Sequence, residues 1–190
     1  MTNIAIFASG SGSNAENIAL YFQHNEQITV KHLFCNNSNA YVIERSKKLN
    51  IPCTIFNKEE FYGSSKIIDS LKDKKIDYIV LAGFLWLIPK DLVNEFPNKI
   101  INIHPALLPN YGGKGMYGMN VHKAVINNQE KESGITIHIV NEKYDEGNIL
   151  FQAKCSLDST DTADSLAEKI HILEQDNFPQ VIEATIAKQQ

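Results

Sequence analysis

The feature that most constrains the fold of this chain is a regular alternation between short apolar runs rich in β-forming residues and segments with the spacing of amphipathic helices. We expect strands at residues 4–8, 28–35, 53–56 and 78–82, and helices at residues 15–22, 41–49 and 59–71. Strands joined through helices pair in parallel, with right-handed crossovers. This part of the chain therefore predicts a parallel sheet with helices on both faces.

The pattern changes near residue 100. A strand at 100–103 precedes a Gly- and Pro-rich loop at 106–119, a helix at 121–127, strands at 135–140 and 149–155, and a terminal helix from about Thr162. The last two strands leave no room for a long helix between them, so we expect at least one antiparallel pairing. The 190 residues suffice for one well-buried core. We predict a single α/β domain over residues 1–190, with a Rossmann-like, mostly parallel sheet and late antiparallel strands.

Charge and composition argue against several kinds of partner. The 18 basic and 22 acidic residues give a net charge of −4 with no basic block, which disfavours a nucleic-acid partner. No apolar run approaches the ~20 residues that cross a bilayer, and the chain begins directly in a strand-like run, so we expect a cytoplasmic protein with no membrane partner. The three cysteines lack the spacing of a zinc site or a disulfide framework and are expected to be buried, reduced thiols.

A glycine-rich loop follows the first expected strand, in the sequence Ser9-Gly10-Ser11-Gly12-Ser13-Asn14. Small residues allow a ligand to approach the backbone, and the N–H groups at the start of the next helix attract an anion. The loop lacks the Lys-Ser/Thr ending of a Walker motif and the third glycine of a dinucleotide fingerprint, so ATP and NAD are disfavoured. It predicts a phosphate site, and the alternative is a tight turn capped by Ser13 or Asn14.

Polar residues gather in two other places. Asn102 and His104 lie on the same side of the strand at 100–103, at its carboxyl end, where open α/β sheets bind their ligands. The polar turn at 141–147 contains Asp145, which could orient His104 and raise its pKa by favouring the imidazolium. Glu142 and Glu146 in the same turn are alternatives to Asp145, and an ordinary solvated turn is the simpler interpretation.

The remaining residues narrow the type of chemistry. No serine or cysteine has an activating sequence context, and the six histidines, His122 and His138 among them, show no metal-ligand spacing. Covalent and metal catalysis are therefore disfavoured. Asn102 and His104 could donate hydrogen bonds to an oxyanion, and Asp145 could take part in proton transfer. This combination is typical of acyl transfer through a tetrahedral intermediate.

Four motifs occur together and in order over nearly the whole chain. They are the loop Ser9 to Asn14, Leu81-Ala82-Gly83-Phe84, Asn102-Ile103-His104-Pro105-Ala106-Leu107-Leu108-Pro109, and Asp145-Glu146-Gly147. In these motifs the chain resembles the phosphoribosylglycinamide formyltransferases. The resemblance implies a Rossmann-like formyltransferase fold, and transfer of the formyl group of 10-formyltetrahydrofolate, as co-substrate, to the amine of phosphoribosylglycinamide in purine biosynthesis. It implies no metal.

The resemblance also implies a role for each matching residue. Asn102 and His104 would stabilise the oxyanion, and Asp145 would tune His104 and help to relay the proton. The ribotide would contact Gly12, Ser13, Asn14 and Glu174, the last of which falls on the inward stripe of the terminal helix between Ile170 and Phe178. The folate would contact Leu85, Trp86, Leu87, Ile88, Asn102, Val140, Asn141 and Tyr144. The partners would be these two small molecules, and the protein a monomer or a homodimer.

Two features depart from the family pattern. Trp86 stands where many members carry an arginine, and the loop at 110–120 is longer than in several relatives. Two other folate enzymes, a formyl-folate hydrolase and a formyltransferase acting on charged initiator tRNA, usually carry an additional domain and are disfavoured by the length of this chain. A non-catalytic phosphosugar-binding module is the alternative from another class, and it would not need Asn102, His104 and Asp145 together.

Overall fold

The computed structural model describes residues 1–189. Its seven strands form a sheet in the order β3-β2-β1-β4-β5-β6-β7. The strands are β1 (Thr2–Ala8), β2 (Ile28–Cys35), β3 (Cys53–Ile55), β4 (Tyr78–Leu81), β5 (Ile100–His104), β6 (Glu132–Ile139) and β7 (Ile149–Ser156). The helices are α1 (Ser13–Tyr21), α2 (Val42–Lys48), α3 (Lys58–Tyr62), α4 (Lys66–Asp73), α5 (Lys90–Glu95), α6 (Met119–Asn127) and α7 (Ala163–Ala187). The chain contacts divide into two compact units, Met1–Ile101 and Asn102–Gln190.

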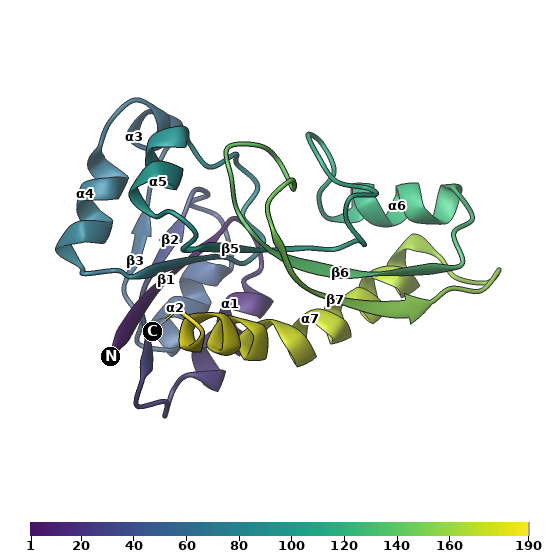
Figure 1. Ribbon diagram of the computed structural model, residues 1–190, viewed down its shortest axis with the longest axis horizontal. Coiled ribbons are helices and arrows are strands. Elements are labelled where there is room, and N and C mark those ends of the chain that lie inside the picture. The colour runs from purple at the N-terminus through teal and green to yellow at the C-terminus, as the bar shows by residue number, and fades with distance from the viewer. Residues whose placement is uncertain (190) are drawn as a thin grey trace. The chain divides into compact units, whose positions relative to one another are not determined.

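The first unit is built on parallel strands. β1 pairs in parallel with β2 on one side and with β4 on the other, and β2 pairs in parallel with β3. Helices α1 and α2 lie on one side of these strands and α3, α4 and α5 on the other (Figure 1). Because both faces are covered, β1 and β4 are buried along nearly their whole length. Aromatic rings fill part of this core, with Phe7 stacked on Phe34 at 4.8 Å between centroids.

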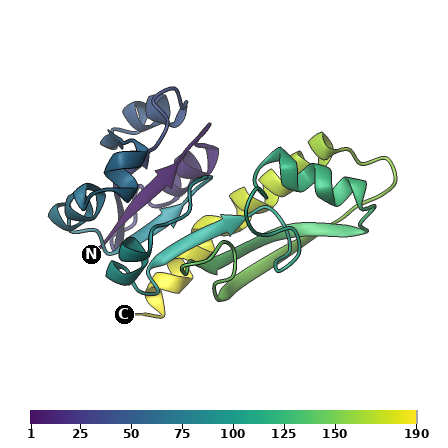
Figure 2. The same cartoon turned by 90° about the horizontal axis from the view of Figure 1, so that it is seen from above.

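The second unit contains the antiparallel pair. β6 and β7 run antiparallel, as expected, with Ile135 opposite Ala153. α7 packs against both strands and against α6, and Figure 2 shows α6 beside α7. The long helix starts where the sequence predicts, because Thr162 caps its first turn in a capping box with Ser165. The predicted fold class, a mostly parallel sheet with late antiparallel strands and helices around it, is confirmed.

Several local predictions were wrong. The single helix predicted at 59–71 is two helices, α3 and α4, interrupted at residues 63–65. Gly63 ends α3, and serines follow it, which are weak helix formers. The short helix α5 was not predicted. All three cysteines are free, but only Cys35 is buried, while Cys53 and Cys155 are half-buried.

Two predictions about the whole chain stay open. The single domain over residues 1–190 stays a prediction, because the chain contacts divide into two compact units. Among the described helices, none combines the length and apolar character needed to cross a membrane. The cytoplasmic location also stays a prediction.

Candidate active site

The end of β5 is held in place by Thr136 of β6. The Thr136 hydroxyl donates to the carbonyl of Ala106 at 2.7 Å and accepts the backbone N–H of Leu108 at 2.9 Å. Gln152 of β7 adds hydrogen bonds to the same hydroxyl and to the carbonyl of Leu108. These contacts fix the turn that follows His104 against β6 and β7.

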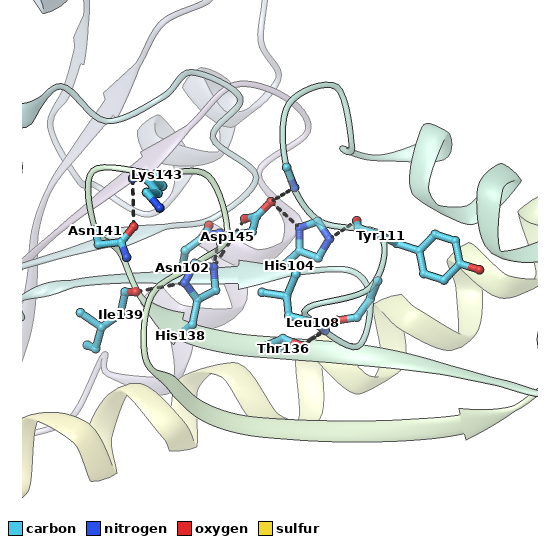
Figure 3. A network of polar contacts seen from close by, with 12 residues as sticks. Asn102, His104, Leu108, Tyr111, Thr136, His138, Ile139, Asn141, Lys143 and Asp145 are labelled. Carbon is cyan, nitrogen blue, oxygen red and sulfur yellow. Dashed lines mark hydrogen bonds and ion pairs between the residues drawn. The ribbon is translucent and has the colours of Figure 1, made fainter.

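His104 and Asp145 meet in the second unit, although 40 residues separate them in the sequence (Figure 3). Nδ1 of His104 lies 3.5 Å from Oδ2 of Asp145, and their side chains are only 4% and 11% exposed. Asp145 has a positive φ of 55°, within the turn between β6 and β7. The structure thus brings together the pair that motif order predicted, and Asp145 rather than Glu142 or Glu146 makes the contact.

Asn102 joins the cluster through His138. Nδ2 of Asn102 lies 3.0 Å from Nε2 of His138, and Nδ1 of His138 lies 3.1 Å from the carbonyl of Ile139. Nε2 of His138 is also 3.6 Å from Oδ1 of Asp145. Asn102, His104, His138 and Asp145 therefore form one cluster, which we call the polar cluster.

No role was predicted for His138, which was one of six histidines without metal-ligand spacing. The signal that could have found it lies in β6, where Thr136 and His138 are polar positions two apart among isoleucines. Alternation along a strand places both on one face. That face meets the end of β5, because Thr136 contacts the turn after His104 and His138 contacts Asn102. Two polar residues on one face of a buried strand are therefore a sequence signal for a polar site, and this signal was missed.

The loop of uncertain role, residues 110–120, contributes backbone groups to the polar cluster. The carbonyl of Tyr111 lies 2.8 Å from Nε2 of His104, and the N–H of Gly113 donates to Oδ2 of Asp145 at 2.9 Å. Gly112 lies so close that a Cβ there would come within 3.2 Å of the Cβ of Asp145. The nearest atom to that Cβ would be Cδ2 of Leu108 at 2.6 Å, so Gly112 is packed between Leu108 and Asp145.

Burial determines the charge state of His104. Its pKa lies below the usual value of 6.5, because burial of the ring disfavours the imidazolium, and this effect outweighs the opposite effect of Asp145. Burial also acts to raise the pKa of Asp145, but contacts with His138, His104 and the N–H of Gly113 outweigh it, and the pKa lies below its usual range. The cluster at neutral pH is thus a neutral imidazole beside a carboxylate.

The effect of Asp145 on His104 follows the prediction, and burial adds a larger effect of opposite sign. The sequence predicted that Asp145 would raise the pKa of His104, and the carboxylate does act in that direction. The net pKa is nevertheless lowered, because the ring is buried by its tertiary neighbours. His122 of α6 is buried as well, and its pKa is lowered by burial and by the neighbouring His104. A neutral His104 can accept a proton, and Nδ1 then has Asp145 as its hydrogen-bond partner.

The glycine-rich loop lies in the first unit, between β1 and α1. Gly12 is the residue before α1 and has a left-handed conformation with φ 77°. Neither Ser13 nor Asn14 occupies the capping position, which the alternative interpretation required. A Cβ at Gly12 would come within 2.4 Å of Val42, whereas a Cβ at Gly10 would have no heavy atom within 4 Å. The loop is therefore packed against α2 at Gly12 and open at Gly10.

The segment after β4 lies beside this loop. The N–H of Ser9 donates to the carbonyl of Gly83 at 3.1 Å, and the Ser9 hydroxyl accepts the N–H of Leu85 at 3.1 Å. Leu85 is 48% exposed, Trp86 and Leu87 are half-buried, and Ile88 is buried. The Trp86 ring packs on Phe61 at 5.8 Å between centroids, so the half-buried tryptophan belongs to the aromatic cluster of this unit.

The remaining predicted site residues lie in the second unit. Glu174 is half-buried on α7 between the buried Ile170 and Phe178, as the helical stripe predicted, and its carboxylate is 3.9 Å from Nδ1 of His171. Val140 and Asn141 are half-buried and Tyr144 is exposed, all in the turn between β6 and β7 that also holds Asp145. Their predicted contacts with ribotide and folate stay predictions.

Comparison with known proteins identifies the class of this chain. A family model described as "Formyl transferase" matches residues 2–182. The chain therefore belongs to the formyl transferase family.

Several similar proteins are named phosphoribosylglycinamide formyltransferase. The chloroplastic protein of that name from Arabidopsis thaliana is 39% identical over 187 residues, which make up 95% of this chain and 64% of the relative's length. The Bacillus subtilis protein is 35% identical, over 96% of this chain and 93% of the relative. A crystal structure of the Bacillus halodurans protein has a TM-score of 0.89 and 33% identity, and the match covers 100% of this chain and 97% of that one. These likenesses confirm the resemblance that the sequence motifs predicted.

Proposed function

We propose that this protein transfers the formyl group of 10-formyltetrahydrofolate to the amine of phosphoribosylglycinamide. The observation that carries the proposal is the buried contact between His104 and Asp145, with Asn102 two residues before His104 on the same strand. A module that only bound a phosphosugar would have no use for a buried imidazole and carboxylate pair beside an amide donor. The names of the relatives support the choice of substrates.

The residues of the polar cluster divide the chemistry between them. The Asn102 amide has two hydrogens, of which one is directed to His138, and the second can stabilise negative charge that develops on the formyl oxygen. His104 is neutral before reaction, with its hydrogen on Nε2 for the Tyr111 carbonyl, so Nδ1 is the nitrogen that can accept the proton lost by the attacking amine. Asp145 then stabilises the imidazolium through Nδ1, so the cluster favours the charged transition state over the neutral ground state.

Binding is assigned to residues outside the polar cluster. Gly12, Ser13 and Asn14 are proposed to hold the ribotide phosphate with backbone N–H groups at the start of α1, and Glu174 the ribose or glycinamide portion. The folate would lie against Leu85, Trp86, Leu87 and Ile88 and the turn residues Val140, Asn141 and Tyr144. The exposed Leu85 and the half-buried Trp86 support contact with a flat, apolar ring system.

The direct test is release of tetrahydrofolate from 10-formyltetrahydrofolate, followed with and without phosphoribosylglycinamide. We expect release that depends on the ribotide and yields formylated ribotide in equal amount. The variant His104→Ala should lose about 10³-fold or more in turnover. His24→Ala is the matched control, because His24 is an exposed histidine of the first unit, and it should retain full activity.

The same assay separates the alternatives. Release of tetrahydrofolate and formate without ribotide would identify a formyl-folate hydrolase. Binding of the ribotide with no release under any condition would identify a phosphosugar-binding module. Either result would overturn the proposal.

A further inference from the structure

Arg45, the sole arginine of the chain, lies on α2 and contacts the glycine-rich loop of the first unit. Its Nε donates to the carbonyl of Ser11 at 3.0 Å, and its Nη1 pairs with the carboxylate of Glu16. The N–H of Val42 at the start of the same helix donates to the carbonyl of Gly10 at 3.2 Å. α2 thus holds the loop at two of its carbonyl groups, and one of these contacts is made by a charged side chain.

Glu16 has an unfavourable position for an anion site. It lies in the first turn of α1, where its N–H donates to the carbonyl of Gly12 at 2.9 Å. The start of a helix attracts negative charge, and a glutamate there uses the same favourable field that a bound phosphate needs. Within one helical turn, a carboxylate and a phosphate repel each other. An uncompensated Glu16 would therefore weaken binding of the phosphate to this loop.

The guanidinium of Arg45 is placed to cancel that charge. The side chains of Arg45 and Glu16 are only 24% and 31% exposed, so solvent screens their interaction less than that of a fully exposed pair. The guanidinium also lies 5.1 Å from the centre of the Tyr41 ring, which limits its movement. Nε and Nη1 are both used on protein atoms, and the side chain is thereby held in one orientation against the loop.

We propose that Arg45 is a positioning residue for recognition of the ribotide: it neutralises Glu16 and fixes the carbonyl of Ser11, so that the loop presents its N–H groups to the phosphate. This inference rests on the proposed function, because it takes the loop as the site of the ribotide phosphate. It assigns to Arg45 no direct contact with the ligand. Neutralisation of Glu16 and direct contact with the phosphate predict different results when Glu16 is also changed: only the first predicts that ribotide affinity is restored.

The test compares single and double variants in the full-length protein, with ribotide and folate KM and kcat measured for each. Arg45→Met keeps an aliphatic stem against Tyr41 but removes the charge, and we expect the ribotide KM to rise about tenfold while folate KM and kcat change less than twofold. Adding Glu16→Gln to Arg45→Met should restore most of the lost ribotide affinity. Glu16→Gln alone should leave the ribotide KM unchanged or lower it.

Lys48→Met is the matched control. Lys48 is another cation of α2, and its Nζ lies 5.8 Å from the centre of the Tyr41 ring. Its Nζ hydrogen-bonds the Tyr41 hydroxyl, whereas Arg45 contacts the glycine-rich loop. It should leave the ribotide KM unchanged, which separates the contact with Glu16 from a general loss of positive charge on α2.

Two results would overturn the inference while the proposed function stands. If Arg45→Met raises the ribotide KM and Glu16→Gln gives no rescue, neutralisation of Glu16 is not the way in which Arg45 acts. If Arg45→Met leaves the ribotide KM unchanged, the ion pair has no role in recognition. Absence of ribotide-dependent turnover in the unchanged protein would instead overturn the proposed function. Melting temperatures of all variants identify any effect that comes from loss of folding.

Discussion

The glycine-rich loop of the first unit and the polar cluster of the second unit are built in different ways. The loop consists mainly of small residues, so its backbone N–H groups can be approached by a ligand. The polar cluster offers side chains, buried and already hydrogen-bonded to one another, with the charge state of His104 set by burial. Under the proposed function, the loop would bind a phosphate through open backbone, whereas the polar cluster would move a proton between side chains removed from water.

The largest expected effect concerns Asp145 in the polar cluster. Asp145→Asn keeps an acceptor for the N–H of Gly113 but removes the charge that stabilises a protonated His104. Turnover should fall by roughly 10²- to 10⁴-fold, the range for a positioned acid-base group, while the ribotide affinity changes little. Turnover against pH, ribotide affinity and melting temperature would be measured together. Near-normal turnover in a folded variant would show that the charge of Asp145 does not support catalysis through His104.

A buried histidine of the first unit provides the contrast to His104. His32 hydrogen-bonds Thr54 at 2.8 Å, and burial together with the charge of Lys74 lowers its pKa to about 4. Because the unfolded chain binds this proton near pH 6.5 and the folded chain only near pH 4, stability should fall as the pH drops between these values. His32 should account for about 2–3 kcal/mol of that loss.

Urea unfolding at pH 7 and pH 4.5 would measure this loss in the unchanged protein and in His32→Gln. The variant should show a shallower dependence on pH and normal turnover at pH 7, because His32 lies outside the proposed catalytic residues. His104 and His122 have pKa values lowered in the same direction, so part of the loss should remain in the variant. An unchanged pH dependence in His32→Gln would remove His32 as its source.

The next effect concerns the backbone of the glycine-rich loop. Gly12→Val, the obvious substitution, would place a side chain against Val42 and force a branched residue to adopt φ 77°, so it would disturb the fold as well as the ligand. Gly10→Ala is the better test, because its Cβ would meet no heavy atom within 4 Å. If the phosphate lies against this backbone, Gly10→Ala should weaken ribotide binding by about tenfold and leave folate binding intact. Equal loss of both affinities would count against the assignment.

The smallest expected effect is spectroscopic. Trp86 is the only tryptophan, and its half-buried ring packs among the aromatic side chains of the first unit. A folate analogue bound beside residues 85–88 should change the tryptophan emission by some tens of per cent, because a pterin ring and an indole would then be close neighbours. Emission that stays constant at saturating analogue would place Trp86 outside the folate site. The variant Phe61→Leu would show how far the packing of Phe61 on Trp86, without any ligand, determines the emission.

Sequence alone determined the alternation of strands and helices, the antiparallel last pair and the loop at Ser9 to Asn14. It did so because these features depend on local spacing and residue type: alternation for strands, glycine for close approach, and Thr162 with Ser165 for the start of α7. The break at Gly63 was missed, although it too is local, because a helical pattern on both sides of a glycine resembles one continuous helix.

Only the tertiary structure decided the environment of the polar cluster. Motif order could pair His104 with Asp145, but the net pKa of His104 depends on how much water its neighbours exclude, and no spacing in the sequence records this. The contributions of His138, of the Tyr111 carbonyl and of the Gly113 N–H likewise arise where β5, β6 and the loop at 110–120 meet. The sequence specifies the residue types directly, whereas burial and the contacts between distant segments arise only when the chain has folded.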